Sequence, residues 1–438
     1  MNILESCTLI KDTLDFPVTL LFFAVGTLLT FKTRFIQFRA FPHFLNIIKG
    51  GMARKKVKDN EGEVKTIDAF HALFTAMSTT IGMGNLVGPT VAIYAGGPGA
   101  LFWLIFYIFI GSVTKFTEVV FALTTRVRTN DGHIVGGPMQ YLKHVSPFFA
   151  QWFMYVMSLL FVGWSMVQSN TLAAIFAQDG VPEWMTGVGL AVVTLYVLMG
   201  GAARVGQVAS KLVPIMFFFY VSFAIFILFR DIAALQNAFA QIMSCILTPA
   251  APVGGFLGAS IYQSIRCGFY RGVYITEAGL GTSSIAHAMA DTQKPVDQGV
   301  LAMYSMAADA LLALISGLIV LVTGVWQQGA FRSTLIYEAF KMSAPAMGQI
   351  VLLISVSLFV ITTIIGNSFN GRQTFASITN FRYVNWYIGF SVLMTFIGSM
   401  LHVELAWVSM DILLSLVAIP NLIGITILAF RQPKALEL

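Results

Sequence analysis

An apolar stretch with a Gly-x-Gly near its middle lies at residues 67–94: IDAFHALFTAMSTTIGMGNLVGPTVAIY. A second stretch of this kind, residues 255–289, reads GFLGASIYQSIRCGFYRGVYITEAGLGTSSIAHAM. As one continuous helix the second stretch would be about 52 Å long, whereas the hydrocarbon of a bilayer is only about 30 Å thick. Part of it must leave the membrane or unwind. Glycine lowers the cost of a non-helical backbone, so we expect a helix break at each Gly-x-Gly.

A helix break inside a membrane frees backbone groups that need partners, because the hydrocarbon offers none. Freed amides at the start of a half-helix suit a carboxylate, and freed carbonyls suit an ammonium group or a hard cation. A single Gly-x-Gly would be better explained by close helix packing. Two of them at equivalent places in two overlong stretches favour a pair of breaks that bind a ligand.

The composition is that of a chain surrounded by lipid. Of 438 residues, 57% are apolar and only 11% are charged, and the mean hydropathy is +0.79. Soluble domains carry about 25% charged residues. Eleven segments have the length and composition of membrane spans: 15–31, 67–94, 99–126, 149–177, 184–200, 211–229, 255–289, 298–323, 347–375, 383–400 and 403–430.

The spans repeat at one offset. Gly82 and Gly279 are 197 residues apart, and the same offset carries each of the four spans after the first break onto a span after the second. Because five helices are an odd number, the second set is inverted in the membrane. The predicted fold is therefore an all-α membrane protein of eleven transmembrane helices, one N-terminal helix plus a 5+5 inverted repeat with two broken helices.

The predicted organisation follows from these spans. It comprises an extra N-terminal transmembrane helix (1–32), a cytoplasmic amphipathic segment and basic loop (33–66), the first five-helix repeat (67–230), an extracellular connection (231–254), the inverted second repeat (255–430) and a cytoplasmic tail (431–438). In the amphipathic segment Phe35, Phe38, Phe44, Ile47 and Ile48 recur at helical spacing. We expect this segment to lie flat on the cytoplasmic leaflet.

Basic residues fix the orientation. With the spans above, nineteen Lys and Arg residues lie in connections or near span ends on one side, four lie on the other side, and three lie deeper inside spans. The positive-inside rule then places the first loop and the C-terminus in the cytoplasm and the N-terminus outside. The net charge of +6 would suit a nucleic-acid partner, but this distribution is explained by the lipid bilayer and we expect no nucleic acid.

An ordered set of motifs resembles the alanine or glycine:cation symporter family, which includes the sodium:alanine symporters. The motifs are Gly82-Met83-Gly84-Asn85, Gly96-Gly97-Pro98-Gly99-Ala100, Gly136-Gly137-Pro138-Met139, Gln168-Ser169-Asn170, Glu277-Ala278-Gly279-Leu280-Gly281, Ile285-Ala286-His287-Ala288 and Ala418-Ile419-Pro420-Asn421-Leu422-Ile423-Gly424. The resemblance implies a leucine-transporter-type fold and uptake of alanine or glycine driven by Na⁺, less often by protons. It implies no cofactor beyond the coupling ion, and a bacterial or archaeal inner membrane.

The resemblance also implies a substrate site, which would involve Thr80, Gly82, Gly84, Asn85, Gln168, Thr276, Gly279, Gly281 and Asn367. Asn85 would reinforce carboxylate binding by the freed amides. Gln168 would bind the substrate or brace the unwound segment. The cation site would join Thr362 and Thr363 to carbonyls near Thr79 and Gly82.

Three positions depart from the family pattern. Asn367 stands where the family often has a tryptophan that helps to cap the pocket, Thr276 replaces an asparagine, and Ser284 replaces a proline. These changes predict a pocket that is larger or more polar than one for alanine, so they leave open a different small zwitterion.

Ionisable residues inside spans are functional candidates because they are costly in a bilayer. Lys115 and Glu118 are three residues apart on one helix face, so we expect them to pair. For the carboxylates we favour bracing of the broken helices over direct ligation, and for the histidines packing over a proton relay. Arg266 and Arg271 are candidates for an extracellular gate, although snorkelling of their side chains to the interface is the simpler explanation. The remaining candidates are His71, Glu277, His287, Asp309 and Asp411.

Two other functional classes fit less well. An intramembrane enzyme would need a nucleophile, base or metal cluster, and the sequence contains no H-E-x-x-H and no Cys/His cluster. A channel would build its filter from several subunits or repeated pore loops, whereas this chain is predicted to have one asymmetric central site.

Overall fold

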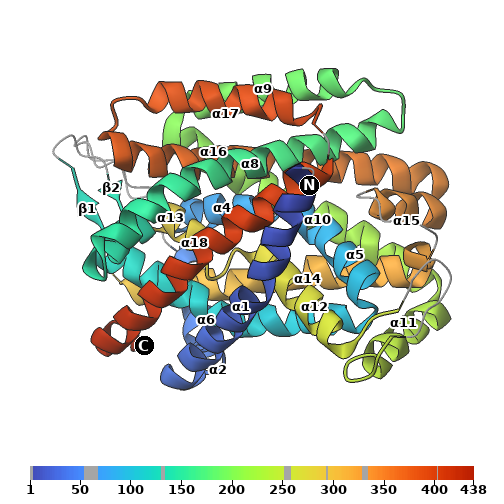
Figure 1. Cartoon of the computed structure of the whole chain (residues 1–438), viewed down its shortest axis with the longest axis horizontal. Coiled ribbons are helices and arrows are strands. Elements are labelled where there is room, and N and C mark those ends of the chain that lie inside the picture. The colour runs from blue at the N-terminus through green and yellow to red at the C-terminus, as the bar shows by residue number, and fades with distance from the viewer. Residues whose placement is uncertain are drawn as a thin grey trace.

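The computed structural model describes residues 3–53, 68–129, 134–250, 258–292, 294–327, 334–401 and 403–438. Within these ranges the chain is almost entirely helical (Figure 1). Seven described helices are long and apolar enough to cross a membrane: α1 (Ile3–Lys32), α6 (Gly99–Thr124), α8 (Pro147–Ala177), α10 (Gly201–Arg230), α14 (Pro295–Thr323), α16 (Pro345–Thr379) and α18 (Val403–Arg431).

The other four predicted spans are shorter or interrupted. Two are the short apolar helices α9 (Glu183–Leu198) and α17 (Val384–Gly398). Two are broken pairs: α4 (Ala69–Thr80) with α5 (Met83–Gly96), and α12 (Ile261–Thr276) with α13 (Thr282–His287). Both predicted helix breaks are therefore present. The number of eleven spans and the inversion of the repeat stay predictions.

Short elements connect the long helices. They are α2 (Ile36–Arg39), α3 (Phe41–Ala53), α7 (Pro138–Tyr141), α11 (Ile232–Ser244), α15 (Leu335–Ser343) and the 3₁₀ turns Leu142–His144, Val325–Gln327 and Pro433–Leu436. Strands β1 (Val127–Arg128) and β2 (Ile134–Val135) pair antiparallel, with Val127 opposite Val135. Two helices begin earlier than expected: α1 starts at Ile3 rather than 15, and α10 at Gly201 rather than 211.

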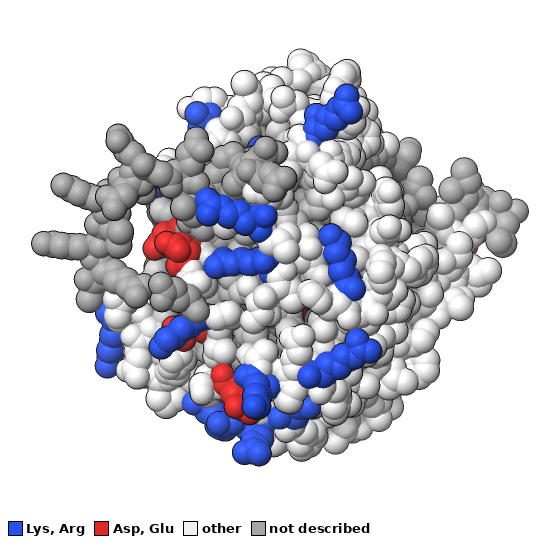
Figure 2. Space-filling model, turned by 90° about the vertical axis from the view of Figure 1, so that its left-hand side faces the viewer, with Lys and Arg blue, Asp and Glu red and all other residues white. Residues whose placement is uncertain are grey.

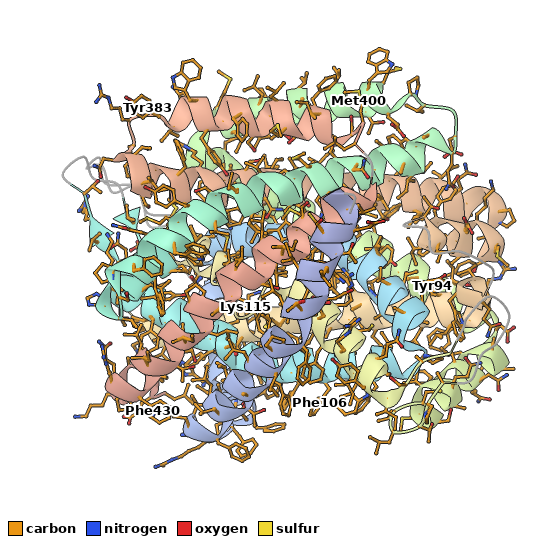
Figure 3. All side chains as sticks on the ribbon, viewed as in Figure 1. Tyr94, Phe106, Lys115, Tyr383, Met400 and Phe430 are labelled. Atoms are coloured by element: carbon orange, nitrogen blue, oxygen red, sulfur yellow. The ribbon has the colours of Figure 1, made fainter. Side chains whose placement is uncertain are left out.

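The helices are layered around the two breaks. α9 and α17 lie side by side at one edge of the molecule and pack on α8 and α16 (Figure 1). In Figure 3, Tyr383 and Met400 mark the two ends of α17, whereas Lys115 lies in the interior. On the other side α1 packs against α6, α12 and α18.

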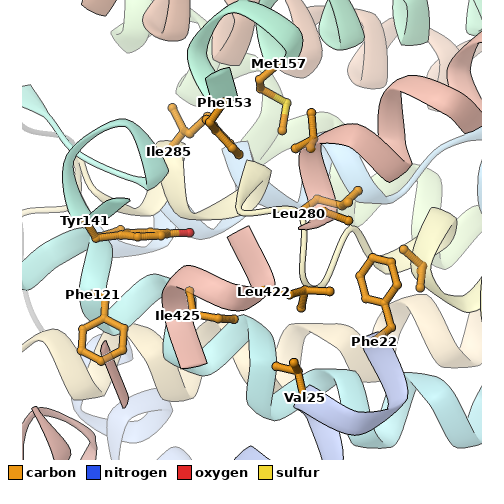
Figure 4. Close-up of a cluster of buried hydrophobic side chains, with 14 of the residues drawn as sticks. Phe22, Val25, Phe121, Tyr141, Phe153, Met157, Leu280, Ile285, Leu422 and Ile425 are labelled. Atoms are coloured by element: carbon orange, nitrogen blue, oxygen red, sulfur yellow. The ribbon is translucent and has the colours of Figure 1, made fainter. Parts of the chain in front are cut away.

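One buried apolar cluster surrounds the second break. Phe22 of α1, Leu280 and Leu422 of α18 belong to it (Figure 4). Phe22 is only 2% exposed, and a Cβ built on Gly279 would lie 2.4 Å from its ring. The N-terminal helix thus covers the second break. A separate cluster formed by α5, α10, α14, α15 and α16 lies beside the first break.

The segment after α1 has apolar side chains on its surface. Phe35 and Phe38 are 42% and 66% exposed, as expected of an interfacial helix, although its place on a leaflet stays a prediction. His43 of α3 pairs with Asp297 of α14 at 2.8 Å. The predicted basic loop falls mostly outside the described residues.

Candidate functional site: the cavity between the two helix breaks

The first break is two residues long and is stabilised by two side-chain amides. Gly82 has an extended backbone (φ −152°, ψ −160°) between α4 and α5. Its N–H donates to Asn85 Oδ1 at 3.0 Å, and the Met83 N–H donates to Gln168 Oε1 at 3.3 Å. A Cβ on Gly82 would lie 2.3 Å from Thr363 Oγ1. Glycine is required here because α16 approaches closely.

The second break runs from Glu277 to Gly281 and depends on left-handed backbone. Glu277, Gly279 and Gly281 have φ of 56°, 91° and 75°. Glycine adopts such values at little cost, whereas a residue with a side chain does so rarely. The two predicted glycines are therefore needed for the chain path.

Buried polar groups brace the second break. Asn421 Nδ2 donates to Glu118 Oε1 at 2.6 Å and to the Gly279 carbonyl at 2.8 Å, and the Tyr141 hydroxyl donates to Asn421 Oδ1 at 2.5 Å. The Gly281 N–H also donates to Glu118 Oε1, at 3.0 Å. These bonds satisfy backbone groups that the missing helical turn leaves without partners.

The expected pairing of Lys115 with Glu118 is wrong. Lys115 Nζ donates to the Thr276 carbonyl at 3.2 Å, at the end of α12, and Glu118 accepts from the second break as described above. Lys115 and Glu118 therefore each bind backbone groups freed at the second break, instead of forming an ion pair with each other. A cation at the carboxyl end of a helix is also favoured by the helix dipole.

Arg126, just beyond the end of α6, binds the chain that follows α13. Its guanidinium donates to the carbonyls of Ala288, Ala290 and Thr292 at 3.1, 2.7 and 3.2 Å. Burial lowers the pKa of Arg126 from its usual value, but an arginine remains charged at any physiological pH. This side chain thus secures the far end of the second broken helix.

A small cavity lies between the two breaks. The space between its lining residues is about 250 Å³ when open solvent is included. The lining comes from both broken helices, α8 and α16: Thr79, Thr80, Gly82, Gly84, Trp164, Gln168, Tyr274, Glu277, Thr363 and Asn367.

The structure brings six of the eleven predicted site residues to this cavity: Thr80, Gly82, Gly84, Gln168, Asn367 and Thr363. Asn85, Thr276, Gly279, Gly281 and Thr362 do not line it. Asn85 is fully buried and turned into the protein, where it caps Gly82 and donates to Asp309 Oδ1 at 3.2 Å. The expectation that Asp309 braces a broken helix matches this contact.

Three lining side chains were not among the predicted site residues. Trp164 lies one helical turn before Gln168, and Tyr274 precedes the second break. Their rings pack edge to face, with centroids 6.2 Å apart. Glu277 was predicted to brace the broken helices, and its Oε2 accepts from the hydroxyls of Thr282 and Thr79. The sequence could have indicated Glu277 as a lining residue, because it is a carboxylate directly next to the predicted second break.

Helix ends give the cavity one side of positive and one side of negative electrostatic potential. Gly84 is in the first turn of α5, where the N–H groups have no partner within the helix, and no hydrogen bond joins its N–H to another described residue. The carboxyl end of α4 and the Glu277 carboxylate supply negative charge to the same cavity. A carboxylate and an ammonium group can each find a complementary pole here.

The two candidate cation ligands on α16 point to different neighbours. Thr363 Oγ1 lies 3.2 Å from the Ile81 carbonyl in the first break and 2.8 Å from Phe359 O in its own helix. Thr362 Oγ1 bonds back to Leu358 and Phe359 and touches Met216 Sδ. Among the described residues no group of three His, Cys, Asp or Glu could hold a metal ion.

The remaining buried charges lie outside the cavity lining. Arg271 faces the rings of Tyr270, Tyr274 and Trp407 at 5.7–5.8 Å. Asp411 Oδ1 has no hydrogen-bond partner in the described ranges. His287 Nδ1 lies 2.8 Å from Gln298 Nε2, whereas His287 Nε2 has no hydrogen-bond partner in the described part of the chain.

Comparison with known proteins agrees with this architecture. The model of the sodium:alanine symporter family matches residues 3–437. The sodium/alanine symporter AgcS of Methanococcus maripaludis is 31% identical over 422 residues, which cover 93% of this chain and 91% of that protein. The probable sodium/glutamine symporter GlnT of Bacillus subtilis is 28% identical over 419 residues, with coverage of 93% and 84%.

Solved structures give the same fold. The crystal structure of MhsT in complex with L-phenylalanine matches with a TM-score of 0.59 at 12% identity, over 84% of this chain and 90% of that one. Such a likeness establishes the leucine-transporter-type fold and no more. The apolar helices and the family match together make this a multi-pass membrane transporter. The chain belongs to the sodium:alanine symporter family.

Proposed function

We propose that the chain is a symporter that couples the movement of Na⁺ to uptake of a small neutral amino acid by alternating access. The observation that carries this proposal is the cavity between the two helix breaks, which has a helix amino end on one side and a carboxylate with a helix carboxyl end on the other. An amino-acid zwitterion has the matching pair of charges.

In this proposal the substrate carboxylate binds the Gly84 N–H in the first turn of α5, beside Thr80 and Gly82. The ammonium group binds Glu277 and the carbonyls that end α4. Gln168 orients the break through Met83 and can reach the substrate from the cavity wall. The other predicted site residues, Asn85, Thr276, Gly279 and Gly281, act by holding the breaks in shape.

The Na⁺ ion is assigned to the contact between α16 and the first break. The hydroxyls of Thr363 and Thr362 and carbonyls near Thr79 and Gly82 would coordinate it, since Na⁺ binds oxygen ligands. The short distance from Thr363 Oγ1 to the Ile81 carbonyl supports this placement. Binding there would join α16 to the broken helix and so couple the ion to the shape of the substrate site.

Alanine or glycine is the expected substrate, because the relative AgcS is named as a sodium/alanine symporter. A different small zwitterion is the alternative, since GlnT is named as a probable sodium/glutamine symporter. Proton coupling is the second alternative, favoured by one observation: Glu277, a buried carboxylate, lines the cavity.

We further propose that the first loop and the C-terminus face the cytoplasm and the N-terminus the outside. Figure 2 shows the side of the molecule that carries β1, β2 and the C-terminal end, and Lys and Arg gather on it. A basic face of this kind is typical of the cytoplasmic side. Cysteine substitutions at Arg230 and Arg431 test this in a chain whose three native cysteines, Cys7, Cys245 and Cys267, are replaced by serine. With a membrane-impermeant thiol reagent on intact cells, Arg230→Cys should react and Arg431→Cys should not.

Uptake by purified protein in liposomes tests the coupling. Radiolabelled L-alanine is supplied with an inward Na⁺ gradient, with choline in place of Na⁺ at fixed pH, or with a pH step alone. We expect uptake only with Na⁺; uptake that ignores Na⁺ and follows the pH step would establish the proton alternative.

Variants at the cation ligands make the test specific. Removing one ligand hydroxyl in Thr363→Val should raise the Na⁺ concentration for half-maximal uptake about tenfold, which corresponds to about 1.4 kcal/mol. Thr362→Val is measured separately. The matched control is Thr374→Val, a buried threonine of the same helix whose hydroxyl bonds only to Asn370 O. Unchanged Na⁺ dependence in both ligand variants would contradict the proposed cation site.

A further inference from the structure

A buried carboxamide lines the cavity without a partner. Asn367 is 1% exposed and belongs to the cavity lining. Its Oδ1 has no hydrogen-bond partner within the described ranges. Nearly all buried polar groups in proteins are hydrogen-bonded, and leaving one unpaired is costly. The partner of Asn367 must therefore come from the contents of the cavity.

The position of Asn367 on α16 supports this reading. Thr363, Asn367 and Asn370 follow one another at helical spacing on one face. Thr363 Oγ1 donates to Ile81 O in the first break, and Asn370 Nδ2 donates to the carbonyl of Thr282 just after the second, at 3.4 Å. The residues on either side of Asn367 thus bind the two breaks, and Asn367 lies level with the space between them.

The backbone of α16 packs closely beside Asn367. A Cβ on Gly366 would lie 2.5 Å from Ser78 Oγ and 2.8 Å from Thr79 Cγ2. The helix is thus packed directly against α4, one residue before Asn367. This contact places the backbone of Asn367 next to the cavity wall that α4 contributes.

The wall contributed by α12 has a second unpaired polar group. Tyr274 is 5% exposed and lines the cavity. Its ring is held between Trp164 and Trp407, with centroids 6.2 and 5.2 Å away. Its hydroxyl has no hydrogen-bond partner among the residues that the structure describes. The cavity wall therefore contains two unpaired polar groups, the hydroxyl of the closely packed Tyr274 ring and the amide oxygen of Asn367.

We propose that Asn367 and Tyr274 form a subsite for the substrate side chain, which selects neutral amino acids that end in a hydroxyl or a carboxamide over apolar amino acids of the same size. The inference rests on the proposed function and names the substrate class of that site. A carboxamide wall both donates and accepts. An apolar side chain would leave Asn367 unpaired, and sites with buried polar groups reject such analogues.

Pairs of isosteric ligands test the subsite. L-serine is compared with L-2-aminobutyrate, and L-asparagine with L-leucine, since the members of each pair have equal numbers of non-hydrogen atoms. Each is measured as a competitor of Na⁺-driven L-alanine uptake and by the increase in melting temperature of the purified protein in NaCl. The second measurement needs no transported reporter, because any ligand that binds the folded state raises its stability.

The polar member of at least one pair should bind about tenfold more tightly than its apolar isostere in the wild type, the value of about 1.4 kcal/mol expected for one net hydrogen bond. In Asn367→Leu, which keeps the size of the side chain, this ratio should fall to about two or less. Ser368→Ala is the matched control, because Ser368 is equally buried and its hydroxyl contacts Ser391 outside the cavity lining. In Ser368→Ala the ratio of the two affinities should equal that of the wild type.

The outcomes separate the two proposals. Equal binding of isosteres in the wild type, or a polar preference that survives Asn367→Leu, would overturn the subsite and leave symport intact. If no amino acid shifts the melting temperature or enters liposomes with Na⁺, the proposed function itself fails, and the subsite with it. Because each ratio is measured within one variant, differences in expression do not affect it.

Discussion

Replacement of Asn421 by leucine should destabilise the second helix break. Asn421 is fully buried and makes three hydrogen bonds, to Glu118, to the Gly279 carbonyl and from Tyr141. Hydrogen bonds between transmembrane helices average about 0.6 kcal/mol, whereas bonds to charged groups reach about 1.5–3 kcal/mol. With one bond to a carboxylate, the loss is about 2–5 kcal/mol.

Thermal unfolding of the purified protein in detergent measures this loss. A domain of 150–250 residues shifts by roughly 2–4 °C per kcal/mol, and a larger chain by less, so the Asn421→Leu variant should melt several degrees below the wild type. Asn237→Leu, at an exposed position of α11, is the matched control and should melt with the wild type.

A second substitution distinguishes hydrogen bonding from packing. Asn421→Asp keeps the size of the side chain but replaces the donor with an oxygen that faces the Glu118 carboxylate. If hydrogen bonds hold the break, the aspartate variant should be no more stable than the leucine variant; if volume alone matters, it should melt close to the wild type. Asn421→Leu melting together with the wild type would refute the bracing role.

Three further substitutions test the break geometry. Gly82→Ala should abolish uptake with little loss of protein from the membrane, because the added Cβ would lie 2.3 Å from Thr363 Oγ1; transport at the wild-type rate would contradict this close approach. Gly279→Ala should lower the melting temperature, because an alanine with a φ of 91° costs about 1–2 kcal/mol. Adding Phe22→Ala to the same chain should not restore the melting temperature, since it leaves this backbone conformation unchanged. Arg126→Met should also melt at a lower temperature, since three carbonyls lose their donor, whereas Lys211→Met, at an exposed position of α10, should melt with the wild type.

The positions of the breaks could be predicted because they follow from local chemistry. A membrane span has a fixed length, and Gly82 and Gly279 lie in the middle of segments that exceed it. The offset between these two glycines also located the helices that follow each break. Neither inference needs knowledge of tertiary contacts.

The direction of each polar side chain could not be predicted in the same way. Asn85 follows Gly82 by three residues, which suits both a helix cap and a ligand, and the contact with Asp309 decides in favour of the cap. Lys115 and Glu118 have the spacing of a helical ion pair, but carbonyls and amides freed from the second break compete for them. Tertiary partners determined the outcome in both cases.

Aromatic side chains of the cavity carried no local signal. The chain has 38 Phe, 13 Tyr and 7 Trp, most of which serve the lipid surface or the core, so Trp164 and Tyr274 do not stand out. Asn367 did stand out, as a polar residue at a position where an aromatic one was expected. Its lack of a partner became visible only with the neighbouring helices in place.

The first helix makes the two halves of the molecule unequal. Phe22 covers the break at Gly279. Any movement of the helices at this break must therefore displace the Phe22 ring. The break at Gly82 instead lies against the hydroxyl of Thr363. The two helix breaks therefore differ in what covers them: an aromatic ring at the second and a hydroxyl group at the first.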